Sequence, residues 1–402
     1  MAATKLDAQP PRFSHRSEND WLGAARALVP TLLENSAEIE AQRELPRNVL
    51  EAMHNAGLFR MTLPHDLDGG ELPVPVLAQI TQIIAGADAS AGWCLGQGLG
   101  CAMTSAFLSP EIASEVFAPP NGVLAWGAGI QGTATKVQGG YRVSGTWRFA
   151  SGGKHATWLG GHSWVVNEDG APLVHENGKR VDRTMVFPRD QATILDDWHV
   201  MGLKGTRSEG YVVEELFVPD AYTLDRESRE ECRLGSTLYK FPTTNAYASM
   251  FSGVALGIAR SMLDDLIELS RSKTARGART SMRESPVLHT RLAELEAQWG
   301  SAKMFQSQTL KEVWSEVDAS DGITLEQRAR IRLVTTYAIN QATEVAEQVY
   351  RLAGSSALFE NDAFERRFRD IHAVSQQVQA RHTNYETVGR YLLGLDVDVM
   401  FM

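Results

Sequence analysis

The chain has 402 residues, a formal net charge of −10 and a hydrophobic fraction of 43%. This length exceeds what one small core holds, so two or three packed units are expected. The acidic balance argues against a nucleic-acid surface, which needs clustered lysines and arginines. Three cysteines without metal-ligand spacing or a paired framework predict a reducing compartment and no metal site. No signal peptide and no membrane-length apolar run are visible, so a cytoplasmic protein without membrane or nucleic-acid partners is expected.

The N-terminal part of the chain is predicted to be helical. Residues 1–18 contain few apolar side chains and two successive prolines, which is typical of a flexible terminus. A helical domain is expected over residues 19–124. Apolar residues recur at helical spacing from Trp21 to Ile39, and a second helix is expected between Pro46 and Gly57.

The rest of the chain changes period twice. Residues 125–230 carry short β-branched and aromatic runs between glycine-rich turns, which predict a central β-barrel-like domain. Residues 231–402 return to long amphipathic runs, which predict a C-terminal four-helix bundle. The four runs are Ala246–Ser272, Val287–Val317, Leu325–Ala353 and Glu365–Leu393. The expected fold class is therefore α+β, and mostly α.

Several local motifs follow this order of units. They are Leu45-Pro46 to Gly69-Gly70, Ser151 to Trp158, Trp198 to Ser208, Arg351 to Ser356 and Arg367 to Asp370. Each motif is weak alone, but in this order and at these distances they resemble the acyl-CoA dehydrogenase superfamily across nearly the whole chain. The resemblance implies a bound flavin.

The dehydrogenases of that superfamily need a carboxylate base, which this chain lacks. In the commonest form a Glu follows the Arg-Asp pair by a little over two helical turns, and Val378 is near that position here. A minority form carries the Glu on the first helix of the bundle, but residues 239–262 contain no acid. Dehydrogenation of an acyl-CoA is therefore disfavoured.

The segment Trp147-Arg-Phe149-Ala-Ser151-Gly is similar to the Trp-x-Phe-x-Ser-Gly signature of the monooxygenase branch. That branch includes hydroxylases of aromatic and polycyclic phenols and amino-sugar N-oxygenases. The resemblance implies the oxygenase component of a two-component system, in which a separate NAD(P)H:flavin reductase supplies reduced FMN or FAD. Reaction with O₂ then gives a C4a-hydroperoxyflavin that oxygenates the substrate. Ser151 is expected at the reactive edge of the flavin, where it or nearby backbone supplies a donor near flavin N5.

A phenolic substrate would also need a base, and histidine suits this because its pKa is near neutrality. The monooxygenases often carry a His shortly after Arg-Asp, where this chain has Gln376-Gln377. The remaining candidates are His372, which shares a helix face with Gln376, and His382. If neither lines the pocket, an indole, a sulfur heterocycle or an amine fits better than a phenol.

Further contacts are expected from the resemblance and from residue type. A Gly-Ser-Ser turn before a helix offers donors for phosphate, although it is also a plain helix-to-helix turn. The basic segment around Lys273 either reaches a flavin or is a solvated loop. The expected cofactor residues are Trp147, Phe149, Ser151, Arg271, Arg276, Arg279, Gly354, Ser355, Ser356 and Gln376. The expected substrate residues are Trp93, Tyr239, Phe241, Tyr247, Met250 and Phe251, each equally consistent with core packing.

The resemblance implies a homotetramer built as a dimer of dimers, because a neighbouring subunit completes the flavin site in the superfamily. Two other readings stay open: a divergent acyl-CoA dehydrogenase or flavin oxidase, and a non-catalytic flavin-binding or interaction protein. The sequence leaves open the substrate and the choice between FMN and FAD.

Overall fold

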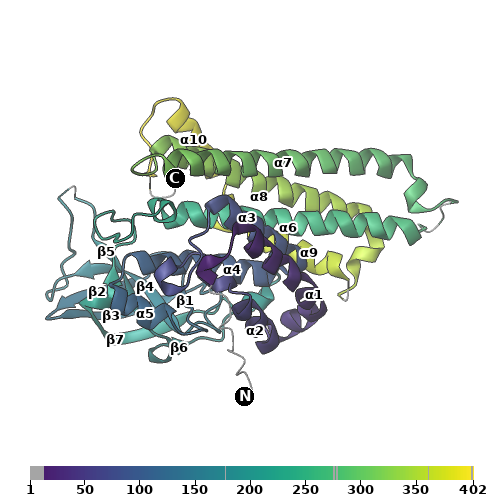
Figure 1. The fold of residues 1–402 in the computed structure, drawn as a ribbon. Helices are drawn as coiled ribbons and strands as arrows, with labels where there is room; N and C mark the ends of the chain where they lie inside the picture. The colour runs from purple at the N-terminus through teal and green to yellow at the C-terminus, as the bar shows by residue number, and fades with distance from the viewer. Residues whose placement is uncertain (1–12, 177, 275–276, 278, 361, 400–401) are drawn as a thin grey trace, which may run out of the picture.

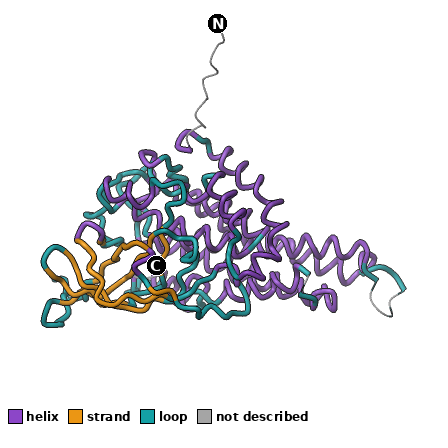
Figure 2. Tube along the Cα trace, turned by 90° about the horizontal axis from the view of Figure 1, so that it is seen from below, coloured by secondary structure: helices purple, strands orange, loops and turns teal. Residues whose placement is uncertain are grey.

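The computed structural model describes all residues except 1–12, 177, 275–276, 278, 361 and 400–401. Within that part of the chain, five α-helices precede eight strands and five α-helices follow them. Figure 1 shows the later helices as a long layer above the N-terminal helices and the strands. Figure 2 shows the strands gathered at one end of the molecule. The predicted class, α+β and mostly α, is confirmed.

The N-terminal helices begin where side chains cap them. Ser17 and Asp20 form a reciprocal capping box at the start of the first helix, and Asp88 accepts a hydrogen bond from the Ala91 amide at the start of the fourth (2.9 Å). The helices are α1 (Glu18–Gln42), α2 (Arg47–Asn55), α3 (Val74–Ala87), α4 (Ala89–Ala102) and α5 (Pro110–Phe117). Of the predicted flexible segment 1–18, residues 1–12 lie outside the described part.

The strands form one mixed sheet in the order β6-β7-β3-β2-β4-β5-β8, with β1 paired to β4. β1 and β2 run parallel to β4, and the other pairs are antiparallel. The strands are β1 (Leu124–Trp126), β2 (Gly132–Val137), β3 (Gly140–Trp147), β4 (Trp158–Val166), β5 (Asp182–Pro188), β6 (Thr193–Ile194), β7 (Tyr211–Pro219) and β8 (Thr223–Leu224). This arrangement sets the end of β3 beside the start of β7, where the candidate site lies.

Trp147 is the centre of the sheet's core. Its ring stacks on Tyr211 with centroids 5.4 Å apart, and its indole N–H donates to the His162 carbonyl (2.9 Å). A Cβ added at any of three glycines would overlap the indole, so these glycines make the room for it: Gly132, Gly145 and Gly161. Trp147, a predicted cofactor residue, has a fully buried side chain.

The C-terminal helices are α6 (Thr243–Ser272), α7 (Pro286–Asp318), α8 (Leu325–Ala353), α9 (Ala363–Ser375) and α10 (Thr383–Leu392). α6 packs closely on α3, because Gly253 and Gly257 bring its backbone against the carbonyls of Ala78 and Gln82. This contact joins the bundle to the N-terminal helices.

The predicted single helix from Glu365 to Leu393 is wrong, because the chain breaks between α9 and α10. Side chains of α8 hold the carbonyls of the break. The Thr336 hydroxyl donates to the Gln379 carbonyl, and the Asn340 amide donates to the Ala380 carbonyl, both at 2.9 Å. Those carbonyls are therefore turned toward α8 instead of continuing the helix. In the described part of the chain, no helix is long and apolar enough to cross a membrane.

Candidate functional site

The candidate site is built around the turn that follows β3. Ser151 is 6% exposed and follows Phe149, whose φ of 65° lies in the left-handed region. The Gly152 amide donates to the Thr206 carbonyl (3.1 Å), and the Ala150 amide donates to the Glu209 carbonyl (3.3 Å). The turn is thus fixed against the loop that precedes β7.

A row of hydroxyl groups extends from Ser151 into the protein. Ser151 Oγ lies 2.7 Å from Ser208 Oγ, which lies 2.7 Å from Thr206 Oγ1. Thr206 Oγ1 donates to the Leu203 carbonyl at 2.8 Å. On the other side, the indole N–H of Trp93 in α4 donates to Ser151 Oγ at 2.9 Å. We call this chain of hydrogen bonds the hydroxyl row. It begins at the Trp93 indole and continues through the hydroxyls of Ser151, Ser208 and Thr206.

Stacked aromatic rings lie behind Trp93. Trp93 stacks on Phe251 with centroids 4.0 Å apart, and Phe251 stacks on Tyr247 at 5.4 Å. The Tyr247 hydroxyl lies 3.3 Å from Cys101 Sγ, and burial raises the pKa of the Cys101 thiol to about 12. Both groups are therefore uncharged at neutral pH, since burial also raises the pKa of Tyr247. An added Cβ at Gly100 would overlap the Tyr247 ring, so this glycine admits the stack.

The structure brings together four of the predicted residues, Ser151, Trp93, Tyr247 and Phe251. The other predicted substrate residues have separate packing contacts. The Tyr239 hydroxyl donates to the Thr62 carbonyl (3.1 Å), Phe241 stacks on Trp314 (5.5 Å), and Met250 is fully buried with its carbonyl bonded to Thr81. For these three, core packing is the reading that the structure supports.

Neither of the two predicted histidines contacts the turn after β3 that contains Ser151. His372 packs edge-on against Phe368 (4.5 Å) and lies 3.7 Å from Glu347. His382 is exposed in the break between α9 and α10 and packs edge-on against Tyr385 (5.7 Å). Among the described residues, no hydrogen bond or ring contact joins either histidine to the hydroxyl row.

The predicted cofactor residues form two groups. Phe149 is 59% exposed beside the Ser151 turn and packs edge-on to Trp198 (6.2 Å). At the end of α8, Gly354 has a φ of 59° and opens the turn that contains Ser355 and Ser356. Lys273 donates to the Ala353 carbonyl and so stands at this turn.

Of the remaining predicted cofactor residues, three lie in the described part of the chain and one does not. Arg271 pairs with Glu268 (2.6 Å), Arg279 is exposed, and Gln376 is exposed at the end of α9. Arg276 lies outside the described residues.

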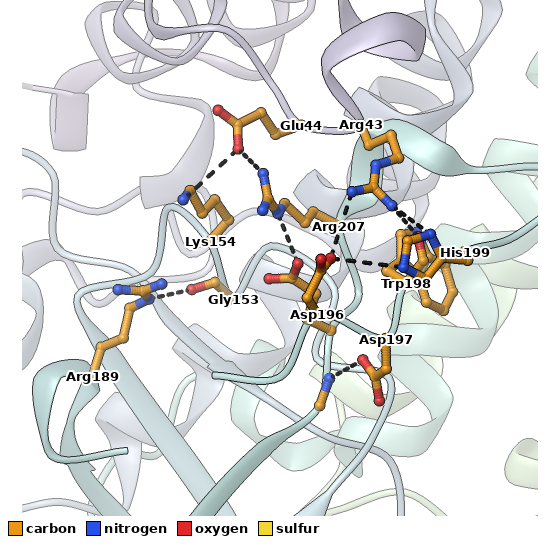
Figure 3. Close-up of polar contacts among 12 residues, drawn as sticks. Arg43, Glu44, Gly153, Lys154, Arg189, Asp196, Asp197, Trp198, His199 and Arg207 are labelled. Carbon is orange, nitrogen blue, oxygen red and sulfur yellow. Dashed lines mark hydrogen bonds and ion pairs between the residues drawn. The ribbon is translucent and has the colours of Figure 1, made fainter. Parts of the chain in front are cut away.

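Polar contacts tie the Ser151 turn to the end of α1 (Figure 3). Arg207 bridges Glu44 (2.6 Å) and Glu209 (2.9 Å), and the Lys154 ammonium lies 4.0 Å from Glu44. Arg43 donates to the Trp198 carbonyl at 3.2 Å. The turn and the loop before β7 are therefore held by the same charged cluster.

Two cavities lie outside this turn. The larger, of about 670 Å³, is lined by charged side chains of α1, α9 and the loop before β7, including Glu40, Lys204 and Arg369. The other, of about 510 Å³, lies by Arg183 and Cys232. Ser151 lines neither of these two cavities. No group of three or more histidine, cysteine, aspartate or glutamate residues suited to a metal occurs in the described part.

The residues present fit a flavin. The exposed ring of Phe149 offers a flat apolar surface, and the adjacent Ser151 hydroxyl offers a polar contact. The Gly354 turn with Lys273 offers backbone amides, hydroxyls and a cation of the kind that phosphate requires. Ser208 and Thr206 were not predicted as site residues, although they belong to the Trp198-to-Ser208 motif. The signal was a pair of small hydroxyl side chains, Thr206 and Ser208, two positions apart.

Two regions of the chain match the acyl-CoA dehydrogenase family. The N-terminal domain matches residues 17–119, and the C-terminal domain matches residues 249–382. The chain belongs to the acyl-CoA dehydrogenase family, as the motifs predicted.

Its relatives define the class further. Indole-3-acetate monooxygenase from Pseudomonas putida is 27% identical, covering 89% of this chain and 89% of that protein. The oxygenase subunit HsaA of a flavin-dependent monooxygenase from Rhodococcus jostii (strain RHA1) is also 27% identical, covering 86% of this chain and 91% of that protein. These relatives confirm the predicted enzyme class, a flavin-dependent monooxygenase.

Solved structures share the fold over nearly the whole chain. The 3-HSA hydroxylase from Rhodococcus sp. RHA1 has a TM-score of 0.87 at 24% identity, covering 95% of this chain and 99% of that one. TdsC from Paenibacillus sp. A11-2, in a complex with FMN and indole, has a TM-score of 0.79 at 21% identity, covering 95% and 99%. These structures confirm the predicted arrangement of helices, sheet and bundle.

Proposed function

We propose that this chain is the oxygenase component of a two-component flavin-dependent monooxygenase that acts on an aromatic or heterocyclic substrate. A separate reductase supplies reduced FMN or FAD, and O₂ is the co-substrate. The observation that carries the proposal is the Ser151 hydroxyl set against the stacked rings of Trp93, Phe251 and Tyr247. The absence of an acid at Val378 and over residues 239–262 removes the base that a dehydrogenase would need.

Each part of the site has a separate task. Bound reduced flavin supplies the electrons that activate O₂. Phe149 would pack against the flavin ring, Ser151 would bond its reactive edge, and the Gly354 turn with Lys273 would hold its phosphate. The aromatic stack binds a flat substrate and keeps water from the reacting atoms.

The substrate that we favour is a flat heterocycle that needs no base, such as an indole. Within the described residues, neither His372 nor His382 contacts the hydroxyl row, so a phenol would lack its base there. The name of the relative from Pseudomonas putida gives indole-3-acetate as its substrate, and TdsC binds indole. The substrate in the first protein's name and the ligand bound in the second structure both support this choice.

The test follows oxygen from O₂ into product. The purified chain is combined with a flavin reductase, NADH, FMN or FAD, and ¹⁸O₂, with indole or phenol as substrate. Mass spectrometry is expected to show one ¹⁸O atom in the indole product, and Ser151→Ala is expected to divert the electrons to H₂O₂. Ser163→Ala is the matched control, because Ser163 is also a buried serine, on β4, and bonds the Gly161 carbonyl. If all NADH oxidation yields H₂O₂ and no aromatic compound gains ¹⁸O, the proposal is wrong.

The assembly that we propose is a homotetramer, a dimer of dimers, in the cytoplasm. Exposed apolar side chains support an interface: Val287 and Met304 of α7, and Leu358 and Phe359 after α8. The three cysteines are free thiols, which suits a reducing compartment. Light scattering after size exclusion is expected to give four chains per particle, and a monomer would contradict the assembly.

A further inference from the structure

The direction of each hydrogen bond in the hydroxyl row follows from counting protons. A hydroxyl group carries one proton, and a carbonyl oxygen can only accept. Thr206 Oγ1 donates to the Leu203 carbonyl, so its proton is used. The 2.7 Å contact between Ser208 and Thr206 must then be donated by Ser208. The 2.7 Å contact between Ser151 and Ser208 must in turn be donated by Ser151.

The other end of the row has a fixed direction as well. An indole nitrogen can only donate, so Ser151 Oγ accepts from Trp93 Nε1 at 2.9 Å. Ser151 thus donates its one hydrogen bond to Ser208 and uses one of its two lone pairs to accept from Trp93. What remains is one lone pair, so Ser151 offers an acceptor to a neighbouring group. The sequence had suggested a donor at this place.

We propose that the hydroxyl row makes this protein select reduced over oxidised flavin, with Ser208 and Thr206 as positioning residues. The inference rests on the proposed function, in which Ser151 lies at the reactive edge of the flavin. Flavin N5 carries a hydrogen in the reduced form and a lone pair in the oxidised form. The free lone pair of Ser151 therefore accepts from reduced flavin, whereas it faces a second lone pair in oxidised flavin.

Oxidised flavin would require the row to reverse. Ser151 would donate to N5, Ser208 to Ser151 and Thr206 to Ser208, which removes the Thr206 hydroxyl bond to the Leu203 carbonyl. That carbonyl keeps two other donors, the Thr206 amide (3.1 Å) and the Trp198 indole (3.2 Å). Reversal therefore costs about one net hydrogen bond, and the expected preference for reduced flavin is roughly threefold to tenfold.

Burial protects the direction of the row. Ser208 is 3% exposed and Thr206 is 1% exposed, so water does not compete for their protons. The ring of His155 lies against Gly152, the residue after Ser151. Burial lowers the pKa of His155 to about 3, so this ring is uncharged at neutral pH. No member of the row gains or loses a proton near neutral pH.

The experiment measures the dissociation constants of reduced and oxidised flavin under anaerobic conditions, with FMN and FAD as the two probes. In the unmodified protein, reduced flavin is expected to bind more tightly. Ser208→Ala removes the acceptor of the Ser151 proton, so Ser151 can donate to oxidised flavin. The ratio of the two constants is then expected to fall roughly threefold to tenfold, mainly through tighter binding of the oxidised form. A redox titration of the bound flavin gives the same ratio independently.

Three further variants separate positioning from folding. Ser208→Thr keeps the hydroxyl and is expected to keep the ratio. Trp93→Phe removes the indole donor but leaves Ser151 donating to Ser208, so the ratio is again expected to stay. Ser163→Ala, the buried serine of β4, controls for the loss of a hydroxyl elsewhere in the sheet.

Two results would overturn the inference in different ways. If Ser208→Ala weakens both forms equally, or leaves the ratio unchanged, the row is structural and the proposed function is unaffected. If the unmodified protein binds neither FMN nor FAD in either form, the proposed function fails and the inference fails with it.

Discussion

Asp370 offers a direct test of how α9 is attached to the loop before β7. Its carboxylate is 3% exposed and accepts from the Leu203 amide at 2.6 Å. Burial raises the pKa of this carboxyl to about 7, and the nearby carboxylates of Asp88 and Glu40 add to the rise. The Asp370→Asn variant keeps an oxygen that can accept from Leu203 but removes the charge.

The direction of the effect follows from the two pKa values. The carboxyl has a pKa of about 7 in the folded chain and an ordinary value of 3.8. Its contribution to stability is therefore complete below about pH 4, falls as the pH rises, and is lost above about pH 7. A rise of about three units corresponds to at most about 4 kcal/mol. At pH 8 the Asn variant is expected to be more stable than the unmodified chain by up to this amount.

The assay is urea-induced unfolding of both proteins at pH 5 and pH 8. The stability of Asp370→Asn relative to the unmodified chain is expected to rise by about 2 to 3 kcal/mol between these pH values. Asp169→Asn is the control, because Asp169 is exposed in a turn of the sheet and its substitution removes the same charge. A relative stability that does not change with pH would refute the burial argument for Asp370.

Three other substitutions test the packing around the site. Gly100→Ala places a methyl group in the Tyr247 ring, so thermal unfolding is expected to show a loss of about 1–3 kcal/mol, with weaker binding of indole by fluorescence titration. Gly152→Ala forces a side chain at a φ of 76°, and urea unfolding is expected to show a loss of about 1–2 kcal/mol. Arg367→Met leaves the Asp265 carboxylate without its ion-pair partner, and a loss of about 1–3 kcal/mol is expected by the same assay. An unchanged midpoint in any of them would contradict the contact that it tests.

Much of the fold could be predicted from local signals. The change from helical to alternating period marks β1, and the return to long apolar runs marks α6. The break between α9 and α10 could not be predicted in the same way. The residues of the break have no proline or glycine, and the chain leaves the helix because Thr336 and Asn340 of α8 bond its carbonyls. Such a contact joins residues about 40 positions apart, so no local pattern reports it.

The site was predictable to the same limited extent. Ser151 could be proposed from the sequence because its signature is contiguous. Trp147 belongs to that signature too, but its enclosure by three glycines from three strands could not be seen from its neighbours in sequence. Ser208 was missed because it meets Ser151 across 57 positions.

The role of Ser151 shows what a motif leaves undecided. A serine in a signature is equally able to donate or to accept, so the motif alone cannot say which form of a flavin it favours. That choice depends on the last group of the row, the Leu203 carbonyl, which can only accept. The amide of the same residue donates to Asp370, and Asp370 is therefore positioned to fix the residue on which the direction of the row depends. A substitution that displaces the Leu203 carbonyl should consequently change the ratio of the dissociation constants of reduced and oxidised flavin, although Ser151 itself is unchanged.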